Sequence, residues 1–185
     1  MRGAALACLS LLLAAGCDRK PAEPPAAPPA SVPVAEAPAP AAPVVGLEGA
    51  YAAISNTAVG VTGDLTASAG TLRFAQGQSY RLEGVSTLKG ARAYASTQGS
   101  FAGLIDVPDT ADLSLFKVMA EDPGKARNGG LCGATPTTYL VTYVGVDGSG
   151  AAGLFVIAFS GQAAPGANSP EAELCGTFMY APKTG

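Results

Sequence analysis

The sequence contains no histidine and no tryptophan. The absence of histidine excludes Ser-His-Asp and Cys-His catalytic sites and every metal site that uses imidazole. The absence of tryptophan removes an aromatic ring that commonly stacks on sugars. We therefore expect a protein that is not an enzyme and that holds no cofactor. A glycosidase built on two carboxylates is the alternative, although no such pair stands out in the sequence.

Charge is also scarce, because only 14% of the residues are charged and 11 Lys and Arg face 14 Asp and Glu. The cations form no block, and nucleic-acid binding requires clustered cations that neutralise phosphates. We therefore expect no nucleic-acid partner. No apolar run reaches the about 20 residues that a membrane-spanning helix needs.

A short apolar run, residues 4–15, follows Arg2 and matches the h-region of a secretory signal peptide in length. It leads into Leu-Ala-Ala-Gly-Cys at residues 13–17, which resembles the lipobox of bacterial lipoproteins. The resemblance implies cleavage after Gly16, a diacylglycerol on the thiol of Cys17 and often a further acyl chain on its amino group. Two or more acyl chains anchor a protein stably, so the resemblance implies a membrane-attached protein of the cell envelope. Ordinary secretion, with Cys17 incidental, is the alternative.

Residues 18–46 consist almost entirely of Pro and Ala. Such a composition cannot form a packed core, and Pro-rich linkers are semi-rigid spacers. With 1–16 as the signal peptide, residues 17–46 are predicted to be a lipidated, disordered tether that carries a domain facing the periplasm. A PxxP recognition segment is the alternative. Asp18 retains some lipoproteins of enteric bacteria in the inner membrane, and the choice between inner and outer membrane stays open.

The composition changes at Leu47, and residues 47–185 are long enough for one domain with its own core. Short runs rich in Val, Leu, Tyr, Phe and Thr alternate with Gly, Asp, Asn or Pro. The predicted strands are 50–55, 57–62, 71–75, 79–85, 99–106, 113–119, 137–146, 153–160 and 174–180. This pattern predicts an all-β domain, either a small antiparallel barrel or a sandwich. Gly49-Ala50-Tyr51 resembles the Gly-x-Trp opening of lipocalin-like barrels, without the Trp.

One short helix is predicted within residues 122–130. Asp122 is a favourable N-cap, and Pro123 suits the first helical position. Gly129 and Gly130 favour a left-handed end to the helix. We expect this helix to connect two strands at one end of the barrel or sandwich.

The segment 121–133 is the main candidate interaction site. It places Lys125, Arg127 and Asn128 beside a pair of glycines. Successive backbone N–H groups in such a loop can form an anion-binding nest. The alternative is a helix cap, a tight turn and two solvated cations.

The four cysteines divide into two groups. Cys8 lies in the predicted signal peptide, and Cys17 is the predicted lipidation site. Cys132 and Cys175 remain, and a pair in an exported domain favours a disulfide. Two buried free thiols are the alternative.

Two further motifs have ordinary structural explanations. Residues 148–153 read Gly-Ser-Gly-Ala-Ala-Gly, which matches G-x-G-x-x-G, but a strand pattern rather than a helix follows, so a hairpin turn is predicted. Asp106, Asp109 and Asp112 recur every third residue but lack the glycine and distal glutamate of an EF-hand, so a surface loop is predicted and no metal is expected. The aromatic residues in three predicted strands, expected to form either core or the wall of a ligand cavity, are Tyr139, Tyr143, Phe155, Phe159, Phe178 and Tyr180.

These features favour a lipid-anchored, non-enzymatic binding or interaction module of the cell envelope. Its expected partners are the membrane, through the acyl chains, and a small ligand or an envelope protein. A proteinaceous inhibitor of an envelope hydrolase such as lysozyme is the second hypothesis, and an enzyme is the third. A cavity lined by aromatic rings favours ligand binding, whereas a filled core with a rigid 121–133 loop favours docking or inhibition.

Overall fold

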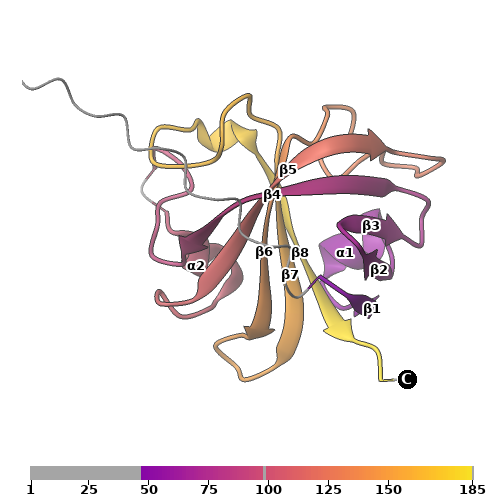
Figure 1. Cartoon of the computed structure of the whole chain (residues 1–185), viewed down its shortest axis with the longest axis horizontal. Helices are drawn as coiled ribbons and strands as arrows, with labels where there is room; N and C mark the ends of the chain where they lie inside the picture. The colour runs from indigo at the N-terminus through magenta and orange to yellow at the C-terminus, as the bar shows by residue number, and fades with distance from the viewer. Residues whose placement is uncertain (1–46, 98, 185) are drawn as a thin grey trace, which may run out of the picture. The chain divides into compact units, whose positions relative to one another are not determined.

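Residues 47–97 and 99–184 are described by a computed structural model, and they form a closed barrel of eight antiparallel strands (Figure 1). Each strand pairs with the next along the chain, and β8 pairs with β1. The strands are β1 (Gly49–Ala53), β2 (Leu65–Ser68), β3 (Thr71–Phe74), β4 (Ser79–Lys89), β5 (Asp112–Asp122), β6 (Tyr139–Val146), β7 (Ala152–Phe159) and β8 (Leu174–Pro182). The all-β prediction is confirmed, and of its two forms the barrel is present. The predicted signal peptide, Gly16, Cys17 and the tether lie outside the described residues.

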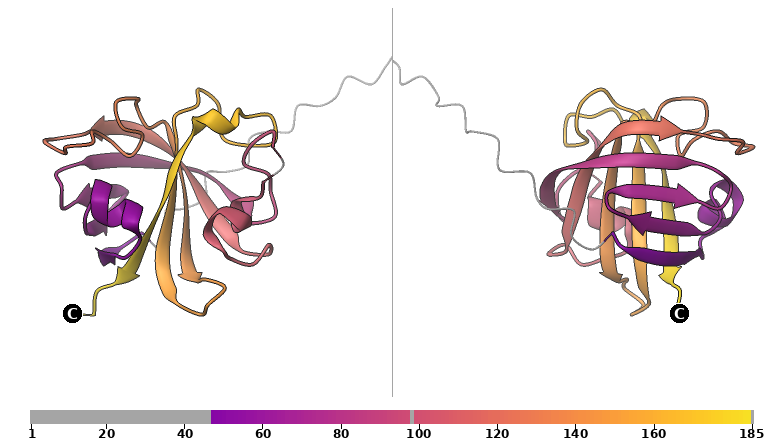
Figure 2. Two further views of the ribbon diagram at one scale, coloured as in Figure 1. Left: turned by 180° about the vertical axis from the view of Figure 1, so that it is seen from behind. Right: turned by 45° about the vertical axis from the view of Figure 1, so that its right-hand side comes forward.

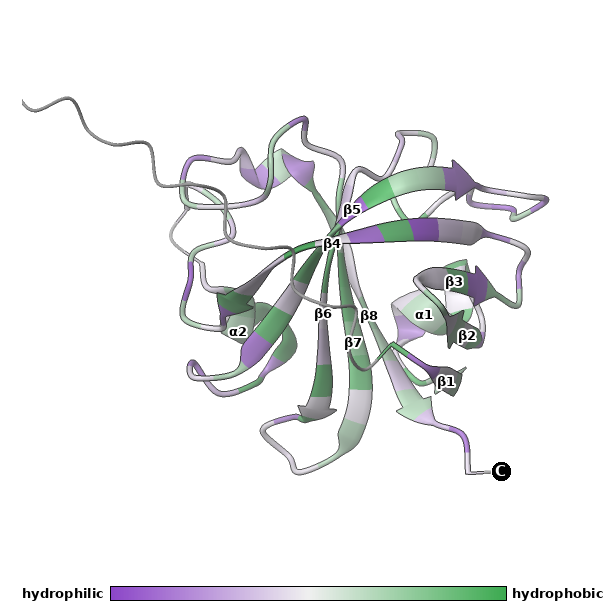
Figure 3. Ribbon diagram, viewed as in Figure 1, coloured by the Kyte–Doolittle hydropathy of each residue, from purple (hydrophilic) through white to green (hydrophobic). Residues whose placement is uncertain are grey.

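The barrel has two hydrophobic clusters, one inside the barrel and one on its outer surface. Strand β7 belongs to both, because alternate residues of a strand face opposite sides. Leu154 and Val156 join the interior cluster, whereas Phe155 and Ile157 join the outer cluster. This explains why every residue of β7 after Ala152 is buried and why the strand is coloured mostly hydrophobic in Figure 3.

Two helices flank the barrel on opposite sides (Figures 1 and 2). Helix α1 (Asn56–Val61) contributes Ala58 to the interior cluster. Helix α2 (Phe101–Ile105) covers the outer cluster with Phe101 and Ile105. Neither helix is long enough to cross a membrane, and the described residues contain no other that is. Because all eight strands and both clusters lie between Leu47 and Pro182, residues 47–185 contain the complete barrel.

Both helices correct a strand prediction. Residues 57–62 and 99–106 were expected to be strands, but serine N-caps begin a helix in each segment. The Oγ atom of Ser55 accepts the N–H of Ala58 at 3.1 Å, and the Oγ atom of Ser100 accepts the N–H of Gly103 at 3.1 Å. Each cap satisfies a backbone donor that the first helical turn leaves free. The short apolar runs fit a single buried helix face as well as they fit a strand.

The helix predicted within residues 122–130 is absent, which is a further correction. Strand β5 continues to Asp122, which pairs with Ser79 of β4. The carboxylate of Asp122 accepts the N–H of Gly124 at 2.9 Å, which closes a turn in place of a helical cap. A helix of so few residues gains few hydrogen bonds for its nucleation cost. The ladder with β4 instead pairs residues 120–122 with residues 79–81.

Strand β2 was not predicted, and β4 and β5 are longer than predicted. A two-residue turn, Ala69-Gly70, joins β2 to β3, and both residues have positive φ, of 45° and 74°. Such primed turns match the twist of hairpin strands. Alanine rarely adopts this conformation, so the sequence has only Gly70 as a signal.

Candidate functional site

The interior of the barrel is filled by aromatic side chains. Phe74 packs on Tyr80 and on Tyr180, with ring centroids 5.7 and 6.1 Å apart. Phe116 and Phe178 complete this group, and all five side chains are buried. Of the aromatic residues singled out from the sequence, Phe178 and Tyr180 face this interior, whereas Tyr139, Tyr143, Phe155 and Phe159 pack in or against the outer cluster. These rings are therefore core, and the centre of the barrel is occupied by side chains.

A disulfide between Cys132 and Cys175 fixes the β5–β6 loop, residues 123–138, to the start of β8. The two Cα atoms lie 4.9 Å apart, and the bridge spans 43 residues of chain. The predicted pairing is confirmed.

A hydrogen-bond network holds the same loop to β4 and β5. The hydroxyl of Tyr80 donates to Glu121 Oε1 at 2.9 Å and accepts the N–H of Leu131 at 2.7 Å. The carboxylate of Glu121 also accepts the N–H of Thr137 at 2.7 Å and its hydroxyl at 3.0 Å. Burial raises the pKa of Tyr80 far above its usual value, so the phenol stays protonated. The middle of the loop, at Leu131, and its C-terminal end, at Thr137, thus share one anchor.

Three side-chain amides bind the end of helix α1, those of Gln76 and Gln78 from the β3–β4 turn and that of Asn128 from the β5–β6 loop. Gln76 donates to the carbonyl of Val59, and Asn128 donates to the carbonyl of Gly60. The buried amide of Gln78 donates to the carbonyls of Val61 and Gly129. The last carbonyls of a helix have no partner within the helix, and these amides satisfy them.

The predicted interaction residues therefore have different roles. Asn128 caps α1, although its side chain was expected to belong to a binding loop. Lys125 and Arg127 are exposed and form no ion pair among the described residues. The structure brings all three into the same loop but places Asn128 against α1.

Two adjacent surface hollows lie along the β5–β6 loop and share Glu121 and Pro136. The first, of about 370 Å³, lies between Lys117–Glu121 of β5 and residues 136–139. The second, of about 290 Å³, lies between Glu121, Pro123 and residues 133–136. The β5–β6 ladder ends at Lys117 and Tyr139, after which the N–H of Val118 reaches the carbonyl of Thr138. Pro136 has no N–H to donate, so the two segments separate there and leave the hollows between them.

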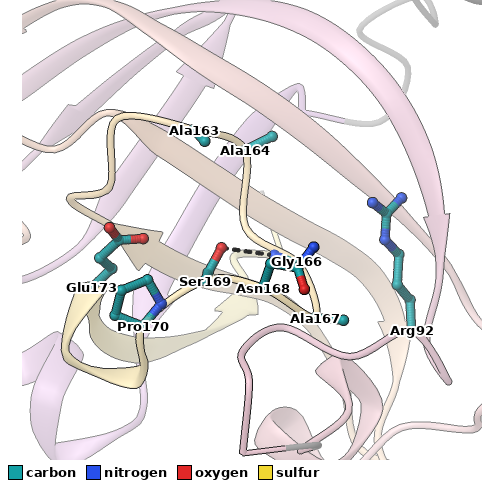
Figure 4. A pocket seen from close by; sticks show the side chains of 9 residues that line it. All are labelled: Arg92, Ala163, Ala164, Gly166, Ala167, Asn168, Ser169, Pro170 and Glu173. Atoms are coloured by element: carbon teal, nitrogen blue, oxygen red, sulfur yellow. Dashed lines mark hydrogen bonds between the residues drawn. The ribbon is translucent and has the colours of Figure 1, made fainter. Parts of the chain in front are cut away.

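A larger hollow, of about 460 Å³, lies beside the β7–β8 loop, residues 160–173 (Figure 4). Ala163, Ala164 and Ala167 provide much of its wall, and the Oγ atom of Ser169 accepts the N–H of Gly166 at 3.1 Å. The charged side chains of Arg92 and Glu173 lie on opposite sides of the hollow and do not converge (Figure 4). No catalytic arrangement follows from this geometry.

The three aspartates singled out from the sequence do not form a metal site. Asp112 forms an ion pair with Lys89 at 2.6 Å. Asp106 ends α2 in a left-handed conformation, with φ of 52°. No cluster of three or more metal ligands occurs within residues 47–97 and 99–184.

The G-x-G-x-x-G segment forms the turn between β6 and β7, as the hairpin prediction required. The carboxylate of Asp147 accepts the N–H and the hydroxyl of Ser149 and the N–H of Ala151. The hydrogen bond from the Ser149 side chain is the main reason that the pKa of Asp147 lies below its usual value.

Sequence reasoning missed the network between Tyr80 and Glu121. The two residues lie 41 positions apart. Tyr80 belongs to no recognisable motif, and Glu121 was noted only as the first residue of the 121–133 segment. Only the register of β4 and β5 brings them together, because Tyr80 pairs directly with Glu121.

Comparisons with protein-family models, with curated proteins and with solved structures found no match to this chain.

Proposed function

We propose that this chain is a lipid-anchored protein of the cell envelope that acts as a non-enzymatic docking module for another protein. Its folded domain faces the periplasm, and the Pro/Ala-rich tether links it to acyl chains on Cys17. The observation that carries the docking role is the filled barrel interior beside a loop that is fixed at several points.

The filled interior supports a protein partner over a small ligand. Ligand sites are usually concave, enclosed and apolar, with a few convergent polar groups. Here the aromatic residues that would line such a cavity pack on each other. The remaining hollows are on the surface, where a protein partner can reach them.

The fixed β5–β6 loop supports docking because a rigid surface loses little conformational freedom on binding. The disulfide, the Tyr80–Glu121 network and the amide of Asn128 each restrain this loop. Exposed Met119, next to the first hollow, adds an apolar contact for a partner.

Inhibition of an envelope hydrolase is the second candidate function. The observation that favours it is again the restrained β5–β6 loop, because a rigid loop can occupy an enzyme cleft without ordering first. The same residues support inhibition and docking, so the two candidate functions differ only in which protein binds the loop.

One experiment on the full chain tests anchoring and docking together. A photo-crosslinking amino acid replaces Ala134, which lines the second hollow, and in a control chain it replaces Thr66, which is exposed on β2. Cells are labelled with radioactive palmitate, irradiated and fractionated. We expect palmitate in the membrane-bound chain, its loss in Cys17→Ser, and a specific crosslinked protein from position 134 but not from 66.

Absence of label from the unsubstituted chain contradicts the anchoring. Equal crosslinking from both positions, or from neither, contradicts the docking. A crosslinked hydrolase whose activity falls when the purified chain is added favours the inhibitor.

A further inference from the structure

The described residues have an asymmetric charge distribution that the docking role does not explain. One part of the surface, which we call the basic end, holds four exposed cations that form no ion pair among the described residues. They are Arg73, Arg81, Lys125 and Arg127. Among the acidic residues nearby, Asp64 is neutralised by Lys183 at 2.7 Å, whereas Asp122, the adjacent Glu121 and Glu83, two residues along β4 from Arg81, form no ion pair among the described residues. With four cations and these three acids the basic end carries a net charge of +1, although residues 47–185, with eight cations and eleven acids, carry −3 and the rest of the domain carries −4.

These cations gather because three segments meet at this end of the barrel. Arg73 and Arg81 flank the β3–β4 turn, where Arg73 pairs with Ser79. The backbone N–H of Lys125 lies close to Gly77 in the same turn. Asn128, the neighbour of Arg127, binds the carbonyl of Gly60 in α1.

Two aliphatic side chains on and beside α1 extend the basic end. Ile54 and Val59 are 50% and 57% exposed, among the most exposed large apolar residues of the described chain. Gln76 of the β3–β4 turn donates to the carbonyl of Val59 at 3.2 Å, so this helix and the cationic turn are in direct contact. Cations and exposed aliphatic groups thus share one surface.

A second part of the surface, which we call the acidic end, lies at the β6–β7 turn and combines unpaired acids with exposed aliphatic residues. Asp106, Asp109 and Asp147 form no ion pair among the described residues, and the N–H of Gly148 donates to the carbonyl of Asp106 at 2.7 Å. The flanking residues Val144 and Val146 are also about half exposed. In Figure 1 this turn is at the bottom, whereas α1 lies to the right and the β5–β6 loop at the upper right.

We propose that the barrel associates head to tail with a second copy of its own chain, so that the basic end of one molecule docks on the acidic end of the next. Each end supplies what the other lacks: unpaired charges of opposite sign and exposed aliphatic residues that association removes from water. A contact between two different surfaces leaves one end free on each molecule, so it extends into rows instead of closing into a dimer. The inference does not depend on Cys17 or on the docking hollows.

The association is tested on residues 47–185 with the disulfide formed, by sedimentation at increasing protein concentration. We expect the average mass to rise with concentration at low salt and to fall back to the monomer at high salt, because salt screens exposed charges. Arg127→Glu is expected to weaken association about tenfold or more, because it places like charges in the contact. Arg92→Glu makes an equal change in net charge at a side chain that lines the hollow beside the β7–β8 loop, and it is the matched control.

Mixing two variants tests the geometry. The basic-end variant is Lys125→Glu/Arg127→Glu, and the acidic-end variant is Asp106→Asn/Asp109→Lys. Each is expected to be monomeric alone. Because each retains the end that the other has lost, their mixture is expected to form one-to-one dimers and nothing larger. Dimer formation also shows that both variants are folded.

Three outcomes overturn the proposal. The first is a monomer at every concentration and salt. The second is association that Arg127→Glu and Arg92→Glu weaken equally. The third is a monomer that binds vesicles of phosphatidylcholine and phosphatidylglycerol through Arg127, which would make a lipid surface the occupant of the basic end.

Discussion

Tyr80 shows how one side chain connects distant parts of this fold. Its ring belongs to the filled interior, whereas its hydroxyl lies between Glu121 and Leu131. Gly130 is adjacent, and a side chain added there would collide with the carboxylate of Glu121. Glycine at position 130 is therefore needed for space.

Replacing Tyr80 by Phe should lower the free energy of unfolding by about 1–3 kcal/mol, because the N–H of Leu131 loses its partner in a buried site and Oε1 of Glu121 keeps only the hydroxyl of Thr137. Urea denaturation followed by circular dichroism measures the change. Tyr139→Phe is the control, because Tyr139 takes no part in the network that joins Tyr80, Glu121, Leu131 and Thr137. Equal stability of both variants would show that the network contributes nothing.

Among the secondary-structure elements, the sequence predicted hairpins correctly where the turn residues are characteristic of hairpin turns. Gln76-Gly77-Gln78 and Asp147-Gly148 mark hairpins that the structure contains. Ser55 and Ser100 were not recognised as helix caps, because each precedes a short apolar run that also fits a strand. Asp122 and Pro123 suggested a helix that pairing with β4 prevents. Local signals therefore failed where a long-range ladder or a buried helix face decided the conformation.

The Cys132–Cys175 pair was predictable from counting, because two of the four cysteines had other assignments. The disulfide stabilises the fold by joining the β5–β6 loop to β8. Cys132→Ser/Cys175→Ser should lower the free energy of unfolding by up to about 4 kcal/mol, since the bridge closes a loop of 43 residues. Thermal denaturation of the variant, beside the unsubstituted chain with and without reductant, measures the change. The reduced chain should behave as the variant does, and a melting temperature unaffected by either change would contradict the stabilising role.

For the whole molecule, the all-β class followed from many short apolar runs, but barrel closure did not. Closure depends on the pairing of β1 with β8, whose partners Ala53 and Tyr180 are far apart in the sequence. The outer cluster under α2 was not predicted either, because residues 99–106 were expected to form a strand of the sheet and not a helix that packs on it. The surface hollows depend on where Pro136 interrupts the β5–β6 ladder, which requires the register of both strands.

The stability of the whole barrel should fall in alkaline solution. Burial raises the pKa of Tyr80 and Tyr180 far above the usual value near 10. Because the folded pKa values are the higher ones, their contribution to stability is fully present below about pH 10 and is lost as the pH rises towards them. The free energy of unfolding should then fall by up to about 2.7 kcal/mol per pH unit for the two groups together.

Tyrosinate absorbance during a rapid titration measures this effect. Two of the six tyrosines should ionise only as the protein unfolds, and the number should drop to one in Tyr180→Phe. Ionisation of all six before unfolding would contradict the assignment.

The order of the strands has a consequence for the timing of folding. Seven of the eight ladders join neighbours in the chain, so each can form as soon as its second strand has been synthesised. The exception is the ladder between β1 and β8, in which Tyr51 of the first strand pairs with Pro182 of the eighth. Until β8 is in place, the outer edge of β1 stays open to pairing with other chains. A partly folded molecule is thus most prone to aggregation before β8 closes the barrel.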